Sequence, residues 1–324
     1  MWKKRRRVVA HLGSFVGPVG TDNLTAPTPW ADRSPVQSSR MPTADIDGTM
    51  IAYEIIGDDG PPWVVTPGGR FSKDAPGVRE LAQALAADGQ RVLIWDRPNC
   101  GASDVCFTGA SESQMQADKL AGLLRSLGLA PAVVMGGSGG SRVSLLTAVR
   151  HPDVTAKLAM VWISGGTYGL LLLAVHYCGE SVRAAWQGGM EAVVALPEWA
   201  EALDRNPRNR ARFLALDPEH FIETLERWML VYCPEPNSTV PGLANEDLAT
   251  LDIPTLIFRS GKSDPHHTRA TSERLHHLIP GSRLVEPPWA DDEWMQRGEA
   301  AREGTGHLFE HWPLLAPQLL EFAT

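Results

Sequence analysis

Cysteine, positive charge and long apolar runs are all scarce in this chain of 324 residues. Its four cysteines, Cys100, Cys106, Cys178 and Cys233, show neither the paired spacing of a metal site nor the density of a disulfide scaffold. The longest apolar run, residues 170–175, is far short of the roughly 20 residues that span a bilayer. We therefore expect a cytoplasmic protein with reduced thiols and no transmembrane helix.

The shortage of positive charge limits the partners. The formal net charge is −8, so nucleic acids and anionic membranes would not attract the chain at long range. No phosphate-cradling loop or dinucleotide fingerprint is present, and the histidine pairs at 266–267 and 276–277 lack the further ligands of a metal site. We expect a small-molecule substrate, no cofactor and no metal. The oligomeric state stays open.

Residues 1–40 differ in composition from the rest of the chain. A basic run at residues 3–7 is followed by a stretch rich in Pro, Ser, Thr and Gly that ends at Arg40. Such a segment buries too little apolar surface to fold. We expect a disordered basic tail.

From Ala44 onward, strand and helix patterns alternate. This order predicts an α/β fold with a mostly parallel sheet flanked by helices. Residues 41–164 and 246–324 form the predicted core, and the mainly helical residues 165–245 form a predicted cap, or lid. The expected strands are 50–56, 63–66, 91–95, 132–135, 158–163, 255–258 and 283–286, and the expected core helices are 78–87, 112–127, 268–278 and 313–322.

The most informative motif is Gly-Gly-Ser-Gly-Gly at residues 136–140. It follows the apolar run 132–135 and precedes a helical pattern, so it predicts a sharp turn between a buried strand and a helix. Glycines in such a turn hold a serine exposed and leave space around it. Ser138 is therefore the candidate nucleophile.

A nucleophilic serine needs a base that is itself oriented by an acid. Asp264 lies in a turn-rich loop after the strand at 255–258, where a carboxylate would stand at the carboxyl edge of the sheet. His307, flanked by glycine, lies between the last strand and the last helix. We predict Asp264 as the acid and His307 as the base, since the nearby His311 adjoins Trp312 and Pro313 and suits packing better.

Two backbone amides should hold the oxyanion that forms during attack. Gly139, directly after the nucleophile, supplies the first. Gly69, in the loop after the strand at 63–66, is the expected second donor, with Arg70 as the alternative.

These residues resemble the α/β-hydrolase superfamily from Ala44 to Thr324. Nucleophile, acid and base occur in the family's chain order, and residues 96–104 are similar to the family's turn after its fourth strand, D-x-R-G-x-G-x-S. The resemblance implies the α/β-hydrolase fold with a helical cap. Two departures stand out: Pro67 replaces a histidine that is frequent before the oxyanion glycines, and residues 287–306 lengthen the path from the last strand to His307.

The pocket is less clearly defined by the sequence. We expect a short amphipathic helix within residues 291–303 that helps to shape the pocket through Trp289 or Trp294. Trp186 and Trp228 of the predicted cap, together with Arg70, are further candidates for substrate contact.

The predicted function is a cofactor-independent serine hydrolase that cleaves a carboxylic ester or lactone through an acyl-enzyme. A carbon–carbon bond hydrolase or an amidase similar to proline iminopeptidases would use the same residues. The fold also hosts other classes, so a ligand-binding protein and a non-hydrolytic lyase or cyclase stay open as alternatives.

Overall fold

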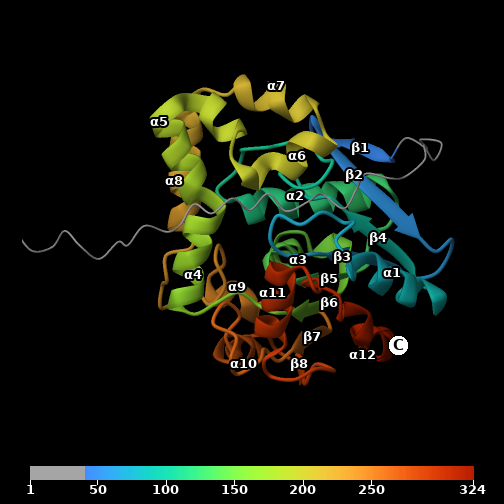
Figure 1. Cartoon of the computed structure of the whole chain (residues 1–324). Helices are drawn as coiled ribbons and strands as arrows, with labels where there is room; N and C mark the ends of the chain where they lie inside the picture. Colours follow the sequence, from blue (N-terminus) through green and yellow to red (C-terminus); the bar gives the residue numbers. More distant parts are fainter. Residues whose placement is uncertain (1–40) are drawn as a thin grey trace, which may run out of the picture. The chain divides into compact units, whose positions relative to one another are not determined.

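An eight-stranded sheet forms the centre of the computed structural model, which describes residues 41–324 (Figure 1). The predicted tail, residues 1–40, lies outside this described part. The strand order is β1-β2-β4-β3-β5-β6-β7-β8, antiparallel between β1 and β2 and between β2 and β4, and parallel elsewhere. The strands are β1 Thr43–Ile46, β2 Thr49–Ile56, β3 Pro62–Thr66, β4 Arg91–Trp95, β5 Ala132–Gly137, β6 Thr155–Val161, β7 Thr255–Phe258 and β8 Arg283–Val285.

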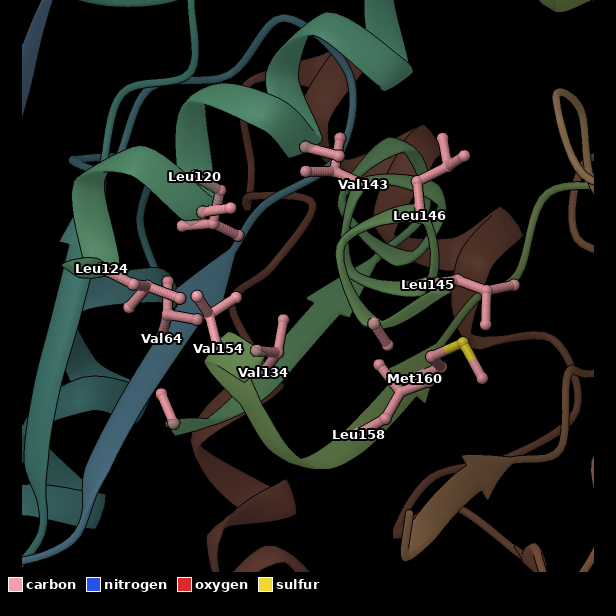
Figure 2. Packing of buried hydrophobic residues seen from close by; sticks show 14 of the residues in the cluster. Val64, Leu120, Leu124, Val134, Val143, Leu145, Leu146, Val154, Leu158 and Met160 are labelled. Carbon is pink, nitrogen blue, oxygen red and sulfur yellow. The ribbon is translucent and has the colours of Figure 1, made fainter. Parts of the chain in front are cut away.

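Both faces of the parallel strands β3, β4, β5 and β7 are buried, which explains their continuous apolar sequences. Successive residues face opposite ways, so Val64 and Val134 belong to one apolar cluster and Val65 and Met135 to the other. Helices α2 (Glu112–Ser126) and α3 (Gly139–Arg150) cover the first face, where Leu120 and Leu124 of α2 belong to the same apolar cluster as both valines (Figure 2). The predicted α/β class and its alternation are confirmed.

The remaining core helices lie near the ranges that the sequence predicts. They are α1 Val78–Ala87, α10 Arg269–Leu278 and α12 Ala316–Ala323, with short 3-10 turns at Pro152–Val154 and Trp312–Leu315. The long connection between β8 and α12 contains α11, Glu293–Glu303, in the region where a short helix is predicted.

A helical insertion follows β6. It comprises α4 Thr167–Ala174, a π turn Val175–Gly179, α5 Glu180–Val194, a 3-10 turn Pro197–Trp199, α6 Ala200–Arg205, α7 Arg208–Leu214 and α8 Pro218–Leu230, and α9 Asn245–Ala249 comes before β7. These helices share a separate apolar cluster that includes Trp199, Phe213 and Trp228, and Val105 and Met115 from outside the insertion also belong to it. Of the helices between residues 41 and 324, none combines the length and the apolar composition that crossing a membrane requires.

A charge network around Asp74 joins this insertion to the segment between β3 and α1. The Asp74 carboxylate lies 2.8 Å from Lys73 Nζ, 2.8 Å from Arg79 Nη2 and 2.6 Å from Nη1 of Arg205 in α6. Burial favours the neutral acid and so raises the pKa of Asp74, but hydrogen bonds from Lys73 and Arg205 outweigh it. The net effect holds the pKa of Asp74 well below its usual range.

Asp74→Asn should therefore destabilise the protein at neutral pH by about 1–2 kcal/mol. Since folding lowers this pKa, the contribution is complete above the unfolded value of about 4 and is lost as the pH falls toward the folded value. Urea unfolding of variant and wild type at pH 7 and at steps from pH 5 to 3 should show a difference that shrinks with acid.

Asp153→Asn is the matched control, because Asp153 pairs with Arg125 while 60% of its side chain is exposed. We expect a change of less than about 1 kcal/mol for that variant. A loss in Asp74→Asn that stays constant with pH would contradict this role of the network.

Candidate active site

Ser138 occupies a strained turn between β5 and α3. Its φ of 54° lies in the left-handed region that most side chains avoid. The Ser138 amide points to the end of β6, where the carbonyl oxygens of Val161 and Trp162 accept it at 3.1 and 3.0 Å. The turn thereby presents the serine hydroxyl at the carboxyl edge of the sheet.

Close backbone approach explains the glycines around Ser138. A Cβ on Gly140 would lie 2.0 Å from the carbonyl oxygen of Thr66, at the end of β3. A Cβ on Gly68 would lie 2.5 Å from Ser138 Cβ. Only glycine at both positions lets the loop after β3 reach the nucleophile.

His267 connects Ser138 to Asp264. Its Nε2 lies 2.8 Å from Ser138 Oγ, and its Nδ1 lies 2.9 Å from Asp264 Oδ2. With the proton on Nδ1, the ring donates to Asp264 and accepts the serine hydroxyl, which is the arrangement that activates a serine.

The loop after β7 explains how Asp264 and His267 meet. Oδ1 of Asp264 accepts the amides of His266 and His267, each at 2.9 Å, so the chain turns around the carboxylate. Ser138, Asp264 and His267 are 6%, 4% and 1% exposed. Low exposure strengthens both hydrogen bonds, because little water competes for them.

Two tryptophans confine the His267 ring. Trp162 stacks on it at 6.4 Å between ring centroids, and Trp294 of α11 meets it edge to face at 4.3 Å. Trp294 Nε1 donates to Nδ1 of His266 at 3.0 Å. Burial lowers the pKa of His266, with a further lowering from His267, and so favours the neutral ring that this bond requires.

The histidine bonded to Ser138 is thus not the one that the sequence favours. His307 is exposed, and in residues 41–324 it forms no hydrogen bond with Ser138 or Asp264. Its amide donates to Glu310 Oε2 at 3.2 Å. The reason is the tight turn at Pro265. It places the ring of His267, three residues after Asp264, against the Asp264 carboxylate, so the loop after β8 does not supply the histidine.

The predicted oxyanion donors lie side by side. A Cβ on Gly139 would be 3.5 Å from the amide nitrogen of Gly69. Nη2 of the buried Arg97 donates to the carbonyl oxygens of Gly68 and Gly69 at 3.0 and 2.7 Å. Because the N–H and C=O of a trans peptide point in opposite directions, the bond to Gly68 orients the Gly69 amide away from Arg97 Nη2.

A family model described as "Alpha/beta hydrolase family" matches residues 57–321. The chain belongs to this family. The expected fold class and family resemblance are both confirmed.

Two curated relatives of this α/β hydrolase illustrate the range of the family. A sn-1-specific diacylglycerol lipase of Mus musculus is 35% identical over 130 residues, which are 40% of this chain and 41% of the lipase. A 2-hydroxy-6-oxononadienedioate/2-hydroxy-6-oxononatrienedioate hydrolase of Burkholderia vietnamiensis is 36% identical over 86 residues, 26% of this chain and 29% of that protein. The chain therefore matches less than half the length of each relative.

Solved structures share the fold over most of the chain. The enol-lactonase of Burkholderia xenovorans superposes with a TM-score of 0.53 at 22% identity and covers 87% of this chain and 99% of its own. A putative lipase of Acinetobacter baumannii superposes with a TM-score of 0.58 at 18% identity, over 88% and 90% of the two chains.

Arg70 joins the α/β-hydrolase core to the helical insertion. Its Nη1 lies 2.7 Å from Glu112 Oε1, its Nη2 donates to the carbonyl oxygen of Tyr177 at 2.8 Å, and its guanidinium lies 4.2 Å from the ring of Trp199. These contacts hold the loop after β3 against α2 and the insertion.

The four candidate tryptophans have different surroundings. Trp228 is buried within the insertion and donates to the carbonyl oxygen of Gly109 at 3.2 Å, whereas Trp186 is 68% exposed. Trp289 and Trp294 pack on Trp162, with ring centroids at 5.6 and 5.2 Å. Of the four, Trp294 is the one in contact with the His267 ring.

His267, Trp162 and Tyr177 lie at the candidate site and are not among the residues that the sequence predicts for it. The Asp-Pro-His-His run at residues 264–267 carried a signal for His267, since a proline after the acid favours a tight turn. Trp162 and Tyr177 follow apolar segments and carry no local signal. A Cβ on Gly139 would lie 3.0 Å from Tyr177 Oη, a proximity that comes only from the folded insertion.

Gly68→Ala tests the contact between the loop after β3 and the nucleophile. The new Cβ would displace Ser138 or the loop, so we expect the turnover of a p-nitrophenyl ester to fall by about 10²-fold. Gly298→Ala in α11 is the control, because a Cβ there meets nothing within 4 Å and should leave turnover unchanged. Full activity in a folded Gly68→Ala protein would contradict the described approach.

Proposed function

We propose that this α/β hydrolase is a cofactor-independent serine hydrolase with Ser138 as nucleophile, His267 as general base and Asp264 as the orienting acid. The observation that carries the proposal is the unbroken pair of hydrogen bonds from Ser138 Oγ through the His267 ring to Asp264. All three groups are buried at the carboxyl edge of the sheet.

The reaction begins when Ser138 Oγ attacks a carbonyl carbon and His267 Nε2 takes the hydroxyl proton. Asp264 stabilises the resulting imidazolium through Nδ1, and the amides of Gly69 and Gly139 donate to the oxyanion. His267 then gives its proton to the leaving group. Water activated by the same ring releases the acyl group and restores the serine.

A carboxylic ester or a lactone is the substrate class that we favour. The name of the mouse relative describes ester cleavage in a diacylglycerol. A serine and a histidine in direct contact suit attack on such an activated carbonyl without any further group.

A carbon–carbon bond hydrolase is the second candidate. Several curated relatives, each matched over less than a third of its length, are named as 2-hydroxy-6-oxononadienedioate/2-hydroxy-6-oxononatrienedioate hydrolases. The same serine, histidine and oxyanion donors would serve that reaction. Turnover of simple esters distinguishes the two, because a dedicated carbon–carbon hydrolase should hydrolyse them poorly.

We propose that the helices of residues 165–245 act as a lid on this site. Tyr177, in the π turn of the insertion, approaches Gly139, and Arg70 ties the insertion to the loop after β3. The insertion therefore supplies side chains to the space in front of Ser138.

Ser138→Ala should abolish covalent labelling by a fluorophosphonate and reduce ester turnover by about 10³-fold or more. Labelling and the release of p-nitrophenol from esters of graded chain length provide the two measurements. A ligand-binding protein would be labelled without turnover, and a lyase or cyclase would keep its activity without Ser138. Near-normal turnover in Ser138→Ala would refute the nucleophile.

The base is tested by comparing two histidine variants. His267→Ala should lose about 10³-fold in kcat because the serine proton then has no acceptor. His307→Ala should stay within about threefold of wild type, since the exposed ring is outside the hydrogen-bond chain. The opposite ranking would restore His307 as the base.

A further inference from the structure

Two buried guanidinium groups near Ser138 have no acidic partner within residues 41–324. Arg97 and Arg142 are each 2% exposed. Arg142 donates to three hydroxyl oxygens, those of Ser113 at 3.4 Å, Ser164 at 2.7 Å and Tyr232 at 3.2 Å. Arg97 Nη2 donates to backbone carbonyl oxygens, and Arg97 Nε has no hydrogen-bond partner among the described residues.

Arg70 lies in the same region, but a carboxylate balances its charge. It is also buried, but Glu112 neutralises it at 2.7 Å. In residues 41–324, neither Arg97 nor Arg142 forms a salt bridge of this kind. The wall behind the oxyanion donors therefore has a net positive charge.

Arg97 lies against Gly139, and Arg142 lies against Tyr177, whose hydroxyl approaches Gly139. The position of a Cβ on Gly139 is 3.5 Å from Arg97 Nη1, 3.5 Å from the Gly69 amide nitrogen and 3.0 Å from Tyr177 Oη. Arg142 starts one helical turn after Ser138, and its guanidinium lies 5.5 Å from the centre of the Tyr177 ring. Three hydrogen-bond donors thus surround one face of Gly139, one of them the cation Arg97, and the second cation, Arg142, lies beside the Tyr177 ring.

A guanidinium stays charged when buried, and burial without a counter-ion costs several kcal/mol. An anionic ligand regains part of this free energy when it binds, whereas a neutral ligand does not. A carboxylate also has the acceptor geometry that an arginine and a phenol hydroxyl can share. The charge pattern consequently distinguishes acidic from neutral substrates.

We infer that the substrate carries a free carboxylate close to the scissile carbonyl, held by Arg97 and Tyr177 and stabilised by the charge of Arg142. This inference rests on the proposed function for the location of the reacting carbonyl. The preferred substrates are then half esters or keto acids of dicarboxylic type.

The test compares ethyl hydrogen succinate, glutarate and adipate with their diethyl esters at pH 7.5, with the released acid measured by chromatography. We expect kcat/KM for the best half ester to exceed that of its diethyl ester at least tenfold, as hydrogen bonds to charged groups allow. Tyr177→Phe and Arg142→Met should each lower this ratio by roughly three- to tenfold, mainly through a higher KM for the half ester.

Arg125→Met is the matched control, because Arg125 pairs with Asp153 at the surface, where 46% of the Arg125 side chain is exposed, and it should keep the wild-type ratio. Arg142→Lys preserves the positive charge and should keep most of the preference, which covers the case that Arg142→Met does not fold. Equal or better hydrolysis of the diethyl esters by the wild type would overturn the inference while leaving the serine hydrolase intact.

Calorimetric titration of Ser138→Ala with disodium glutarate and with dimethyl glutarate provides a readout that needs no catalysis. Binding of the dianion alone, weakened by Tyr177→Phe, would support the anion site even if the wild type hydrolysed none of the esters. That result would count against the proposed reaction only. The anion site would be refuted if disodium succinate, glutarate and adipate all failed to bind and the wild type did not prefer half esters over diethyl esters.

Discussion

The close approach of three loops at the carboxyl edge of the parallel sheet is the constraint on which the site depends. The loop after β3 reaches Ser138 because Gly68 and Gly140 have no side chains to block it. The amide of Ser138 is bound by the end of β6, and the loop after β7 brings His267 to its hydroxyl. Since parallel strands all end on one edge, segments far apart in sequence meet there without long connections.

Buried charged side chains lie at this edge of the sheet, and their partners differ. Asp264 accepts hydrogen bonds from the His267 ring and two backbone amides, and Arg70 forms an ion pair with Glu112. Arg97 donates to carbonyl oxygens of the loop after β3, and no carboxylate of residues 41–324 forms a salt bridge with it. The same guanidinium can therefore orient the backbone and attract an anion, because the first task uses Nη2 and the second uses its charge.

The fold could be predicted from the sequence because the apolar pattern of each core strand and helix favours one type of element. The apolar runs at Trp63 and Val133 suit only strands buried on both faces, and the helices between them have one apolar side. The glycines around Ser138 indicate the strand, turn and helix that the structure contains. Asp264, placed by the end of the strand before it, also lies at the predicted edge. The π turn that carries Tyr177 has no such pattern, since its position depends on contacts with α5 and α8.

The choice between His267 and His307 needed the tertiary structure. Both follow a late strand and adjoin residues that favour turns, and the sequence analysis ranks His307 first because it lies between the last strand and the last helix. The decision comes from hydrogen bonding: Asp264 Oδ1 accepts two successive amides, which wraps residues 264–267 around the carboxylate and aims the second histidine at Ser138. The positions of Ser138 and Asp264 at the edge of the sheet follow from local patterns within the sequence. The contact between His267 and Ser138, and the surroundings of Arg97 and Arg142, depend on distances between segments that the sequence does not contain.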